Sequence, residues 1–435
     1  MNQRCFVTGA LLMCLAPALL AQAPAAPAVD SGDTGFMLIS AALVMLMTPG
    51  LAFFYGGMVR PKNVLGTMMQ SFMAVAIISI QWMLIGYSLG FGPDKGHVIG
   101  GLEWVGLRGV GMTPNPDYAA TIPHQAYMIY QCMFAIITPA LITGAVAERM
   151  KFKTYLVFML LWSTLVYDPI AHWVWGTGGW LRNMGALDFA GGTVVHISSG
   201  VAALVAALMI GRRRGYPNTP MPPHNLPYTL LGTGLLWFGW FGFNAGSAVT
   251  AGAASTGAFI ATHVAAASAA IGWVMMDWLV KGRPTALGAA SGAVAGLVAI
   301  TPASGYVGPL SAIVIGAAAG CVCFLAVMLR AKTTVDDSLD VFGVHGTGGT
   351  LGALMTGLFA QKAINAAGAD GLFFGNPSLF GAQVVAVLAT WVYAGAVTYV
   401  LLRVLDLTMG LRVNAEQEDE GLDVAEHGES AYALD

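Results

Sequence analysis

The sequence predicts an all-α integral membrane protein with eleven transmembrane helices, arranged as two inverted units of five plus a final helix. Composition is the first observation, because 57% of the 435 residues are hydrophobic and only 9% are charged. About a quarter of the residues are charged in an ordinary soluble domain, which needs polar surface to cover its core. Lipid solvates the outside of a membrane protein instead. The composition therefore excludes a soluble protein, and the positions of the apolar segments and basic residues give the number of helices.

The first residues of the chain have the pattern of a cleaved secretory signal. One Arg near the start precedes an apolar stretch from Phe6 to Leu20, and Ala-Gln-Ala follows at 21–23. The stretch is short for a membrane span, and cleavage after Ala21 or after Ala23 fits the pattern. An uncleaved extra helix is the alternative. We expect three parts: a signal peptide at 1–23, a transmembrane domain at 24–409 and a cytoplasmic tail at 410–435.

Eleven apolar segments after this leader are long enough to cross a bilayer, which takes about 20 residues at a rise of about 1.5 Å each. The 56 glycines are spread through these segments, and small residues let membrane helices approach closely. The expected centres of the spans are Val44, Ile77, Ile137, Leu161, Ala203, Leu236, Ala266, Val294, Ala317, Leu354 and Tyr393.

The basic residues test this number of spans, because the cytoplasmic loops of membrane proteins carry an excess of Lys and Arg. With eleven spans, an N-terminus outside and a C-terminus inside, fourteen of the nineteen basic residues fall on the inner side, four on the outer side and Arg4 in the leader. Adding or removing a span would scramble this pattern. The inner set is Arg60, Lys62, Arg149, Lys151, Lys153, Arg212, Arg213, Arg214, Lys281, Arg283, Arg330, Lys332, Arg403 and Arg412, and the outer set is Lys95, Arg108, Arg182 and Lys362.

Two similar segments indicate an inverted repeat. Asp188 to His196 on the fifth span is matched by Asp340 to His345 on the tenth, although the spacing between Asp and His differs. Five spans separate the two segments, and an odd number inverts the second unit in the membrane, as in many transporters whose pathway lies at the repeat interface. A histidine inside a span is costly unless it faces a cavity or a partner. Two histidines at equivalent places in the repeat are more typical of side chains that line a transport pathway than of side chains with a merely structural role.

Aromatic residues and a hydroxyl accompany the histidines. Phe243 and Ser247 stand four residues apart on one helix face. Phe134 lies on the third span, where its position alone indicates a core residue, and Trp175 lies at the outer end of the fourth, where tryptophan is more often an interfacial anchor.

The sequence gives no sign of a metal, a cofactor, a nucleic-acid partner or an enzymatic centre. Cys321 and Cys323 lack the second ligand pair that a structural metal site requires. Two histidines without a third ligand or a nucleophile in register also do not make a metal hydrolase. We therefore expect no metal, no cofactor and no enzyme.

Read together, these segments form an ordered series. The series is Phe54-Tyr-Gly-Gly-Met-Val-Arg60-Pro-Lys-Asn63-Val-Leu, Gly144-Ala-Val-Ala-Glu148-Arg149, Asp188-Phe-Ala-Gly-Gly-Thr-Val-Val-His196, Gly239-Trp-Phe-Gly-Phe-Asn-Ala-Gly-Ser247, Gly292-Ala-Val-Ala-Gly-Leu-Val, Thr301-Pro-Ala and Asp340-Val-Phe-Gly-Val-His345-Gly. It resembles the signature blocks of the ammonium transporter family, and the resemblance runs from about Asp33 to the C-terminus. No isolated short motif would produce that order.

The resemblance implies transport of ammonium for nitrogen uptake across the cell inner (plasma) membrane by a homotrimer. It implies an outer recruitment site for the ion at Trp175 and Ser247, with Phe134 beside it. It also implies a stacked gate of Phe134 and Phe243. Under the gate, the ion would lose its proton and pass as ammonia through a hydrophobic pore. A twin-histidine pair, His196 and His345, would line this pore and relay the proton.

Asp188 resembles the family's buried carboxylate needed for conduction. A competing interpretation is a capping carboxylate at the start of the fifth helix, and the two roles can coexist. Two departures from the family pattern remain. Tyr130 stands where the family often has Phe and is expected to add a hydroxyl to the vestibule, and the loop after Trp175 is one residue longer than expected.

The acidic segment after Arg412 is similar to the family's regulatory tail in its Gly421-Leu-Asp-Val and His427-Gly-Glu. We expect it to fold against the cytoplasmic face and to dock a PII-type signalling protein. A solvated, disordered end is the alternative. Other functions remain open: a Rhesus-type ammonia or carbon dioxide channel, in which the features at Trp175 and Ser247 are typically absent, and a membrane-embedded sensor.

Overall fold

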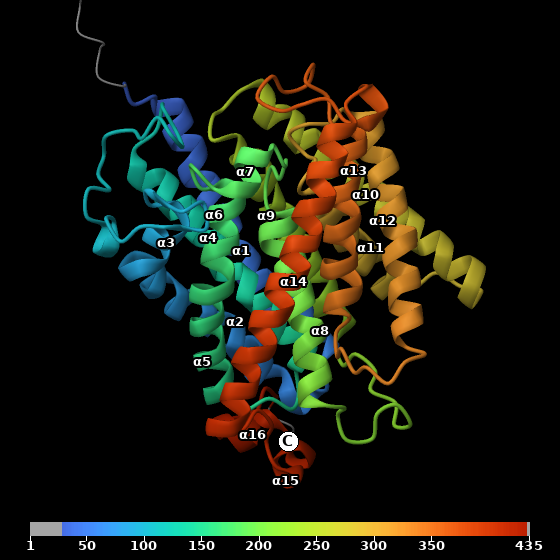
Figure 1. Ribbon diagram of the computed structural model, residues 1–435. Coiled ribbons are helices and arrows are strands. Elements are labelled where there is room, and N and C mark those ends of the chain that lie inside the picture. Colours follow the sequence, from blue (N-terminus) through green and yellow to red (C-terminus); the bar gives the residue numbers. More distant parts are fainter. Residues whose placement is uncertain (1–27, 433–435) are drawn as a thin grey trace, which may run out of the picture.

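The computed structural model describes residues 28–432, and most of these fold into helices (Figure 1). The part of the chain that is described holds a single small sheet, an antiparallel hairpin of β1 (Asp94–Lys95) and β2 (Ile99–Gly100). The expected signal peptide at 1–23 and its cleavage sites lie outside the described residues.

The first half of the chain forms eight α-helices: α1 (Ser31–Met58), α2 (Val64–Gln81), α3 (Tyr87–Phe91), α4 (His124–Val146), α5 (Phe152–Trp162), α6 (Asp168–Trp175), α7 (Trp180–Met184) and α8 (Ser198–Ile210). The second half also forms eight: α9 (Leu226–Ala245), α10 (Ala253–Lys281), α11 (Ala286–Ile300), α12 (Pro309–Arg330), α13 (Thr347–Phe359), α14 (Pro377–Thr408), α15 (Ala415–Glu420) and α16 (Leu422–His427). The longest, α14, runs along the outside of the bundle (Figure 1).

Each of the eleven expected span centres falls within one of these helices. By length and hydropathy, eight helical segments of the described chain suffice to cross a membrane, and α9, α11 and α13 are not among them. An all-helical membrane fold is therefore confirmed in its coarse form, while the number of eleven spans stays a prediction. The eight segments are Ser31–Met58, Pro61–Phe91, His124–Val146, Phe152–Met184, Gly192–Ile210, Ala253–Lys281, Pro309–Arg330 and Pro377–Thr408.

Close helix packing explains part of the glycine content. A Cβ on Gly232 of α9 would lie 2.3 Å from the backbone nitrogen of Phe54 on α1, and a Cβ on Gly316 of α12 would lie 2.2 Å from the carbonyl oxygen of Ala265 on α10. Only glycine allows these backbones to approach so closely.

Four of the helical segments are interrupted by π-turns, in which the backbone hydrogen bonds span one residue more than in an α-helix. Two of these turns carry the histidines: η5 (Gly192–Ile197) holds His196 and leads into α8, and η7 (Phe342–Gly346) holds His345 and leads into α13. The other two, η2 (Trp82–Gly86) and η4 (Ser163–Tyr167), break the helices before α3 and α6. Single π-turns inside helices are frequent at functional sites.

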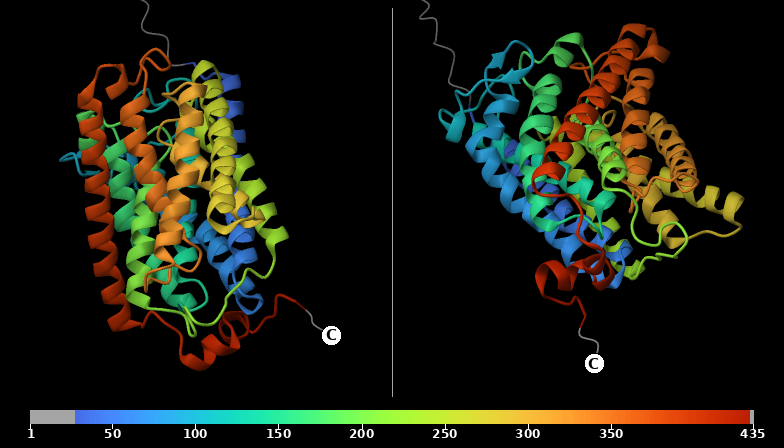
Figure 2. Two further views of the ribbon diagram at one scale, coloured as in Figure 1. Left: turned by 90° about the vertical axis from the view of Figure 1, so that its right-hand side faces the viewer. Right: turned by 60° about the horizontal axis from the view of Figure 1, so that its bottom comes forward.

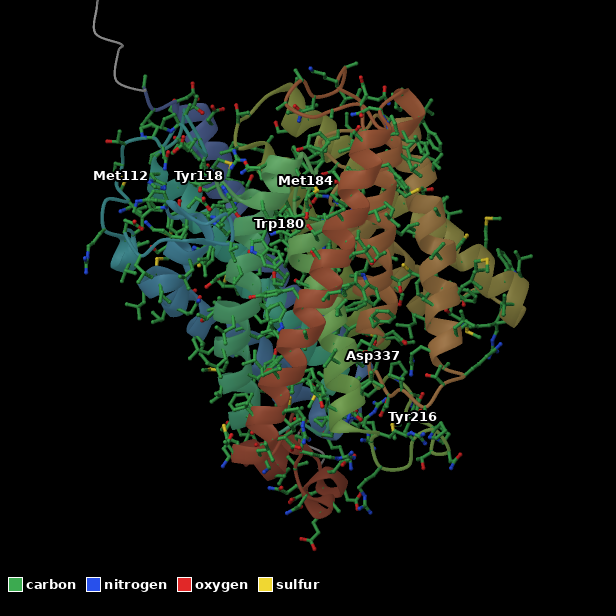
Figure 3. All side chains as sticks on the ribbon, in the orientation of Figure 1. Met112, Tyr118, Trp180, Met184, Tyr216 and Asp337 are labelled. Carbon is green, nitrogen blue, oxygen red and sulfur yellow. The ribbon has the colours of Figure 1, made fainter. Side chains whose placement is uncertain are left out.

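The bundle has two distinct ends. The helices α15 and α16 lie below it in all views, at what we call the tail end (Figure 1 and Figure 2). Asp337 and Tyr216 lie toward this end, whereas Tyr118, Trp180 and Met184 lie toward the opposite end (Figure 3). We call the opposite end the outer end.

Candidate functional site

A cavity of about 640 Å³ near the outer end is the largest feature of the candidate site. We call it the outer chamber. Among the residues that line it are Tyr127, Gln131, Phe134, Trp175, Asp188 and Ser247. Four of the seven residues proposed from the sequence thus border one space, although they come from α4, α6, the segment before η5 and the short 3-10 helix η6 (Gly246–Ala248) that follows α9.

The rings of Phe134 and Trp175 line the floor of the outer chamber, and Phe243, which packs against Phe134, lines a smaller pocket below it. The rings of Phe134 and Phe243 are stacked, with centroids 4.2 Å apart and an interplanar angle of 29°. Trp175 meets Phe134 edge to face at 5.9 Å, and its indole nitrogen donates a hydrogen bond to the carbonyl oxygen of Asp188 at 2.9 Å. Phe134 and Phe243 are almost completely buried, at 1% and 0% exposed. The pair therefore closes the floor in this structure.

Ser247 borders the outer chamber beside this floor. Its hydroxyl donates to the carbonyl oxygen of Phe243 at 2.9 Å, and the hydroxyl of Tyr130 lies 3.1 Å from it. Tyr130 itself is completely buried. The expectation that Tyr130 adds a hydroxyl to the vestibule is therefore wrong, because its hydroxyl points toward the end of α9 and not into the cavity.

Below the floor lies a much smaller pocket of about 10 Å³, which we call the histidine pocket. Phe243 and Trp240 border it together with His196 and His345, and the remaining lining is apolar: Met47, Leu51, Phe54, Ile137, Leu141, Val195, Leu236 and Val294. His345 also borders a second small pocket, of about 40 Å³, which extends to Tyr55 and Asp340. The cavities therefore form a series from the outer chamber toward the tail end.

The two histidines contact each other directly. The Nδ1 atom of His345 lies 3.2 Å from the Nδ1 atom of His196. One Nδ1 must donate and the other accept, so one hydrogen lies between the two rings. When both imidazoles are neutral, the donating ring has a free lone pair on Nε2 and the accepting ring has a proton there. The pair is therefore polarised, with an acceptor at one outer nitrogen and a donor at the other.

Asp188 caps the turn that carries His196. Its Oδ1 accepts from the backbone nitrogens of Gly191 and Gly192 at 2.7 Å each, and its Oδ2 accepts from the backbone nitrogen of Thr193 at 2.7 Å and from the Thr193 hydroxyl. The free N–H groups at the start of a helix attract such a carboxylate. The capping interpretation describes these contacts, and the side chain also borders the outer chamber.

Buried charges hold the tail end together. Glu148 forms ion pairs with Arg60 at 2.7 Å and with Arg213 at 3.2 Å, and Arg213 also pairs with Asp336 at 2.8 Å. Burial on its own would raise the pKa of Glu148, but the charges of Arg213 and Arg60 outweigh it and hold this pKa below its ordinary value. Burial, aided by the negative charge of Asp340, raises the pKa of Asp337 to about 6.

The tail folds against this charged end. The Glu418 carboxylate accepts from the Arg412 side chain at 2.7 Å and from the backbone nitrogen of Arg214 at 2.7 Å. Asp423 accepts from the backbone nitrogen of Gly66 on α2 at 2.8 Å. The alternative of a solvated, disordered end does not describe residues 414–427.

Sequence reasoning missed three features of the site. It gave Tyr127 and Gln131 no role, although both line the outer chamber and hydrogen bond to each other at 3.1 Å. They lie seven and three residues before Phe134, and helical spacing could have placed them on its face. The π-turns are the third feature, and no spacing of residues in the sequence signals them. The described residues contain no group of three or more metal-ligating side chains.

Comparisons with known proteins agree on one family. The model of the Ammonium Transporter Family matches residues 35–432. The ammonium transporter of Bacillus subtilis is 56% identical over 405 residues, which cover 93% of this chain and 99% of that protein. The ammonium transporter of Mycobacterium tuberculosis is 49% identical over 93% of this chain and 90% of that protein.

Solved structures give the same result. The crystal structure of Saccharomyces cerevisiae Mep2 superimposes with a TM-score of 0.84 at 37% identity, over 89% of this chain and 91% of that chain. A structure described as a sensor Amt protein superimposes with a TM-score of 0.85 at 29% identity, over 91% of this chain and 98% of that chain.

Proposed function

The chain belongs to the ammonium transporter family, and from this premise we propose that it recruits ammonium as an ion in the outer chamber and passes it on as ammonia. It is a multi-pass membrane transporter and not an enzyme. The proposal concerns the route and the residues that act along it.

Recruitment is assigned to Trp175, Ser247 and Phe134. All three line the outer chamber, which is large enough to admit a partly hydrated ion. An ammonium ion over a desolvated indole gains up to about 2 kcal/mol of cation–π energy. The Ser247 hydroxyl directs its own proton to the carbonyl oxygen of Phe243, so its lone pairs are available to accept an N–H of the ion.

The floor of the outer chamber and the histidine pocket below it determine which chemical species can pass further along the route. The stacked Phe134 and Phe243 block the path in the closed state, and we assign them to a gate. The pocket under them is small and almost entirely apolar. Moving a bare ion into such a place costs many kcal/mol. A neutral molecule does not meet this barrier, so ammonia passes and potassium, which has no proton to lose, does not.

The proton released by ammonium needs its own route, and we assign it to His196 and His345. The observation that carries the proposal is the 3.2 Å contact between their Nδ1 atoms inside an otherwise apolar pocket. A proton taken up at one outer nitrogen lets the shared hydrogen move, so the far nitrogen can release a proton on the other side. The pair thus relays a proton without admitting an ion.

Asp188 supports both regions. Its carboxylate fixes the start of η5, the turn that holds His196, and its negative charge borders the chamber where the cation is recruited. We propose that conduction requires it for both reasons.

We further propose eleven spans with the N-terminus outside, the C-terminus inside, a homotrimer in the cell inner membrane, and docking of a PII-type protein at the tail end. The folded tail, with Glu418 bonded to the Arg412 side chain and to the backbone nitrogen of Arg214, supplies a rigid surface for such a partner. Deleting the residues after Arg412 should abolish pull-down of a PII protein. Unchanged pull-down would contradict the docking proposal.

The transport proposal is tested with purified protein in liposomes. An ammonium gradient should produce an electrical current that a potassium gradient of equal size does not produce. Internal pH is followed with a trapped dye, because ammonia without its proton would change pH and carry no current. An ammonium gradient that changed neither current nor pH would contradict the transport function.

A sensor is the second candidate, favoured by the likeness to the sensor Amt protein. A sensor would bind ammonium in the outer chamber without carrying it. Calorimetry on the same preparation separates the two functions, since binding without current or pH change indicates a sensor.

A further inference from the structure

Tyr130 makes an unusual set of contacts beside the recruitment site. It lies on α4, one turn before Phe134, and its ring meets that of Phe134 edge to face at 5.0 Å. Its hydroxyl lies 2.9 Å from the carbonyl oxygen of Gly242, 2.8 Å from that of Phe243 and 3.1 Å from the hydroxyl of Ser247. The side chain has no exposed surface. Tyr130 therefore does not touch the space where the ion is recruited but touches the residue that borders it.

The end of α9 explains why a hydroxyl is held there. Helix α9 ends at Ala245, where the backbone N–H of Gly246 donates to the carbonyl oxygen of Gly242 and the Ser247 hydroxyl donates to that of Phe243. Each of these carbonyl oxygens has a second lone pair that can accept another hydrogen bond. Tyr130 supplies a donor from the neighbouring helix α4, and it does so at the turn that leads to Ser247.

Counting the protons shows what this does to Ser247. The two hydroxyls of Tyr130 and Ser247 have one proton each, and the two carbonyls can only accept. The shortest Tyr130 contacts are those to the carbonyls, so Tyr130 donates to them. The Ser247 proton then goes to the Phe243 carbonyl or to the Tyr130 oxygen. In either arrangement its proton stays inside the protein.

We propose that Tyr130 is a positioning residue of the recruitment site, whose hydroxyl holds Ser247 as a hydrogen-bond acceptor toward the outer chamber. An acceptor suits a ligand that carries N–H groups, such as ammonium or a small primary ammonium ion. This inference rests on the proposed recruitment of ammonium by Ser247. The new element is that Tyr130, which lies outside the cavity, helps to set the affinity of the recruitment site for ammonium.

The test is Tyr130→Phe, which removes the hydroxyl and keeps the ring against Phe134. Its ammonium currents should reach the wild-type maximum, but the concentration for half-maximal current should rise on the order of threefold to tenfold, the range expected for one net hydrogen bond. The same substitution in a Ser247→Ala background should change that concentration less than about twofold, because Tyr130 acts through Ser247.

Tyr155→Phe is the matched control. Tyr155 is equally buried and also donates to a backbone carbonyl, that of Pro139, at 2.8 Å. Its variant should show a similar loss of thermal stability and unchanged apparent affinity. If Tyr130→Phe does not fold, Gly246→Ala tests the same contact, because a Cβ there would lie 2.8 Å from the Tyr130 hydroxyl and displace it.

The outcomes separate this inference from the proposed function. If the wild-type protein produces neither a current nor a pH change, the proposed transport function itself is wrong. With wild-type transport intact, an unchanged half-maximal concentration in Tyr130→Phe overturns the inference. An equal shift with and without Ser247 also overturns it, since Tyr130 would then act by another route.

Discussion

The outer chamber and the histidine pocket differ in almost every physical respect, although only one pair of stacked rings separates them. The chamber has about 640 Å³ and is lined by hydroxyls, two amides, two carboxylates, a guanidinium and an indole. The pocket has about 10 Å³ and is lined by apolar side chains and two imidazoles. An ion can keep part of its hydration shell in the outer chamber and none of it in the histidine pocket.

This difference implies that affinity and selectivity are set in different places. In the proposed mechanism the chamber attracts cations, potassium as well as ammonium. The histidine pocket then excludes every charged species by desolvation, so only a cation that can lose a proton passes on as a neutral molecule. Changes in the chamber should therefore alter the concentration dependence of transport, and changes at the pocket should alter what is carried.

Asp188→Ala should have the largest effect, because this carboxylate belongs to both regions. The substitution leaves three buried N–H groups at the start of η5 without an acceptor. Unfolding free energy should fall by about 3 kcal/mol or more, and ammonium current should be lost. Thermal melting and liposome currents measure the two effects. Asp188→Asn, which keeps one carbonyl acceptor, is the control and should recover part of the stability; wild-type current in Asp188→Ala would show that the carboxylate is only a cap.

Trp175→Leu and Ser247→Ala should weaken recruitment and leave conduction in place. Each loses about 1 to 2 kcal/mol of binding energy, which corresponds to a rise in half-maximal concentration of up to about thirtyfold. Current is recorded against ammonium concentration, and potassium is tested in parallel. The maximal current should change little and potassium should stay excluded. An unchanged concentration dependence in both variants would refute the recruitment role.

Asp337 should influence stability with little effect on transport. Its pKa of about 6 in the folded protein exceeds the ordinary value of 3.8, so between these pH values the folded state binds more protons than the unfolded state. Stability from this group is present below about pH 4 and is lost as pH rises through 6, by about 1 to 3 kcal/mol. Asp337→Asn should therefore raise the melting temperature at pH 7.5 but not at pH 4. An equal effect at both pH values would contradict the buried, protonated state.

Much of this comparison could be predicted from the sequence, and the reasons are local. The two Asp-to-His segments, five spans apart, singled out His196 and His345, and the family resemblance implied that they form a pair; the two are in contact. The family resemblance implied that Trp175, Ser247 and Phe134 lie together, and all three line the outer chamber. Such patterns survive in sequence because each is a short run on one helix.

Other features depend on contacts that no short run encodes. A π-turn needs one extra residue within an apolar helix, and this leaves hydrophobic periodicity almost unchanged. The direction of the Tyr130 hydroxyl is set by carbonyls at the end of α9, more than a hundred residues later in the chain. The segment around Val294 was expected to be a span because its apolar stretch is long enough to cross a bilayer, although the helix α11 that it forms has only 15 residues.

The central claim is that the histidine pair moves a proton through a pocket closed to ions. The most direct measurement is the current carried by a stable His196→Ala/His345→Ala double variant under ammonium and then potassium gradients. Loss of a buried hydrogen-bonded imidazole can cost about 1 to 3 kcal/mol, so thermal stability is measured on the same sample. Ammonium current should vanish or potassium current should appear, because the relay is gone and water can fill its place. Ammonium current of wild-type size with potassium still excluded would contradict this claim.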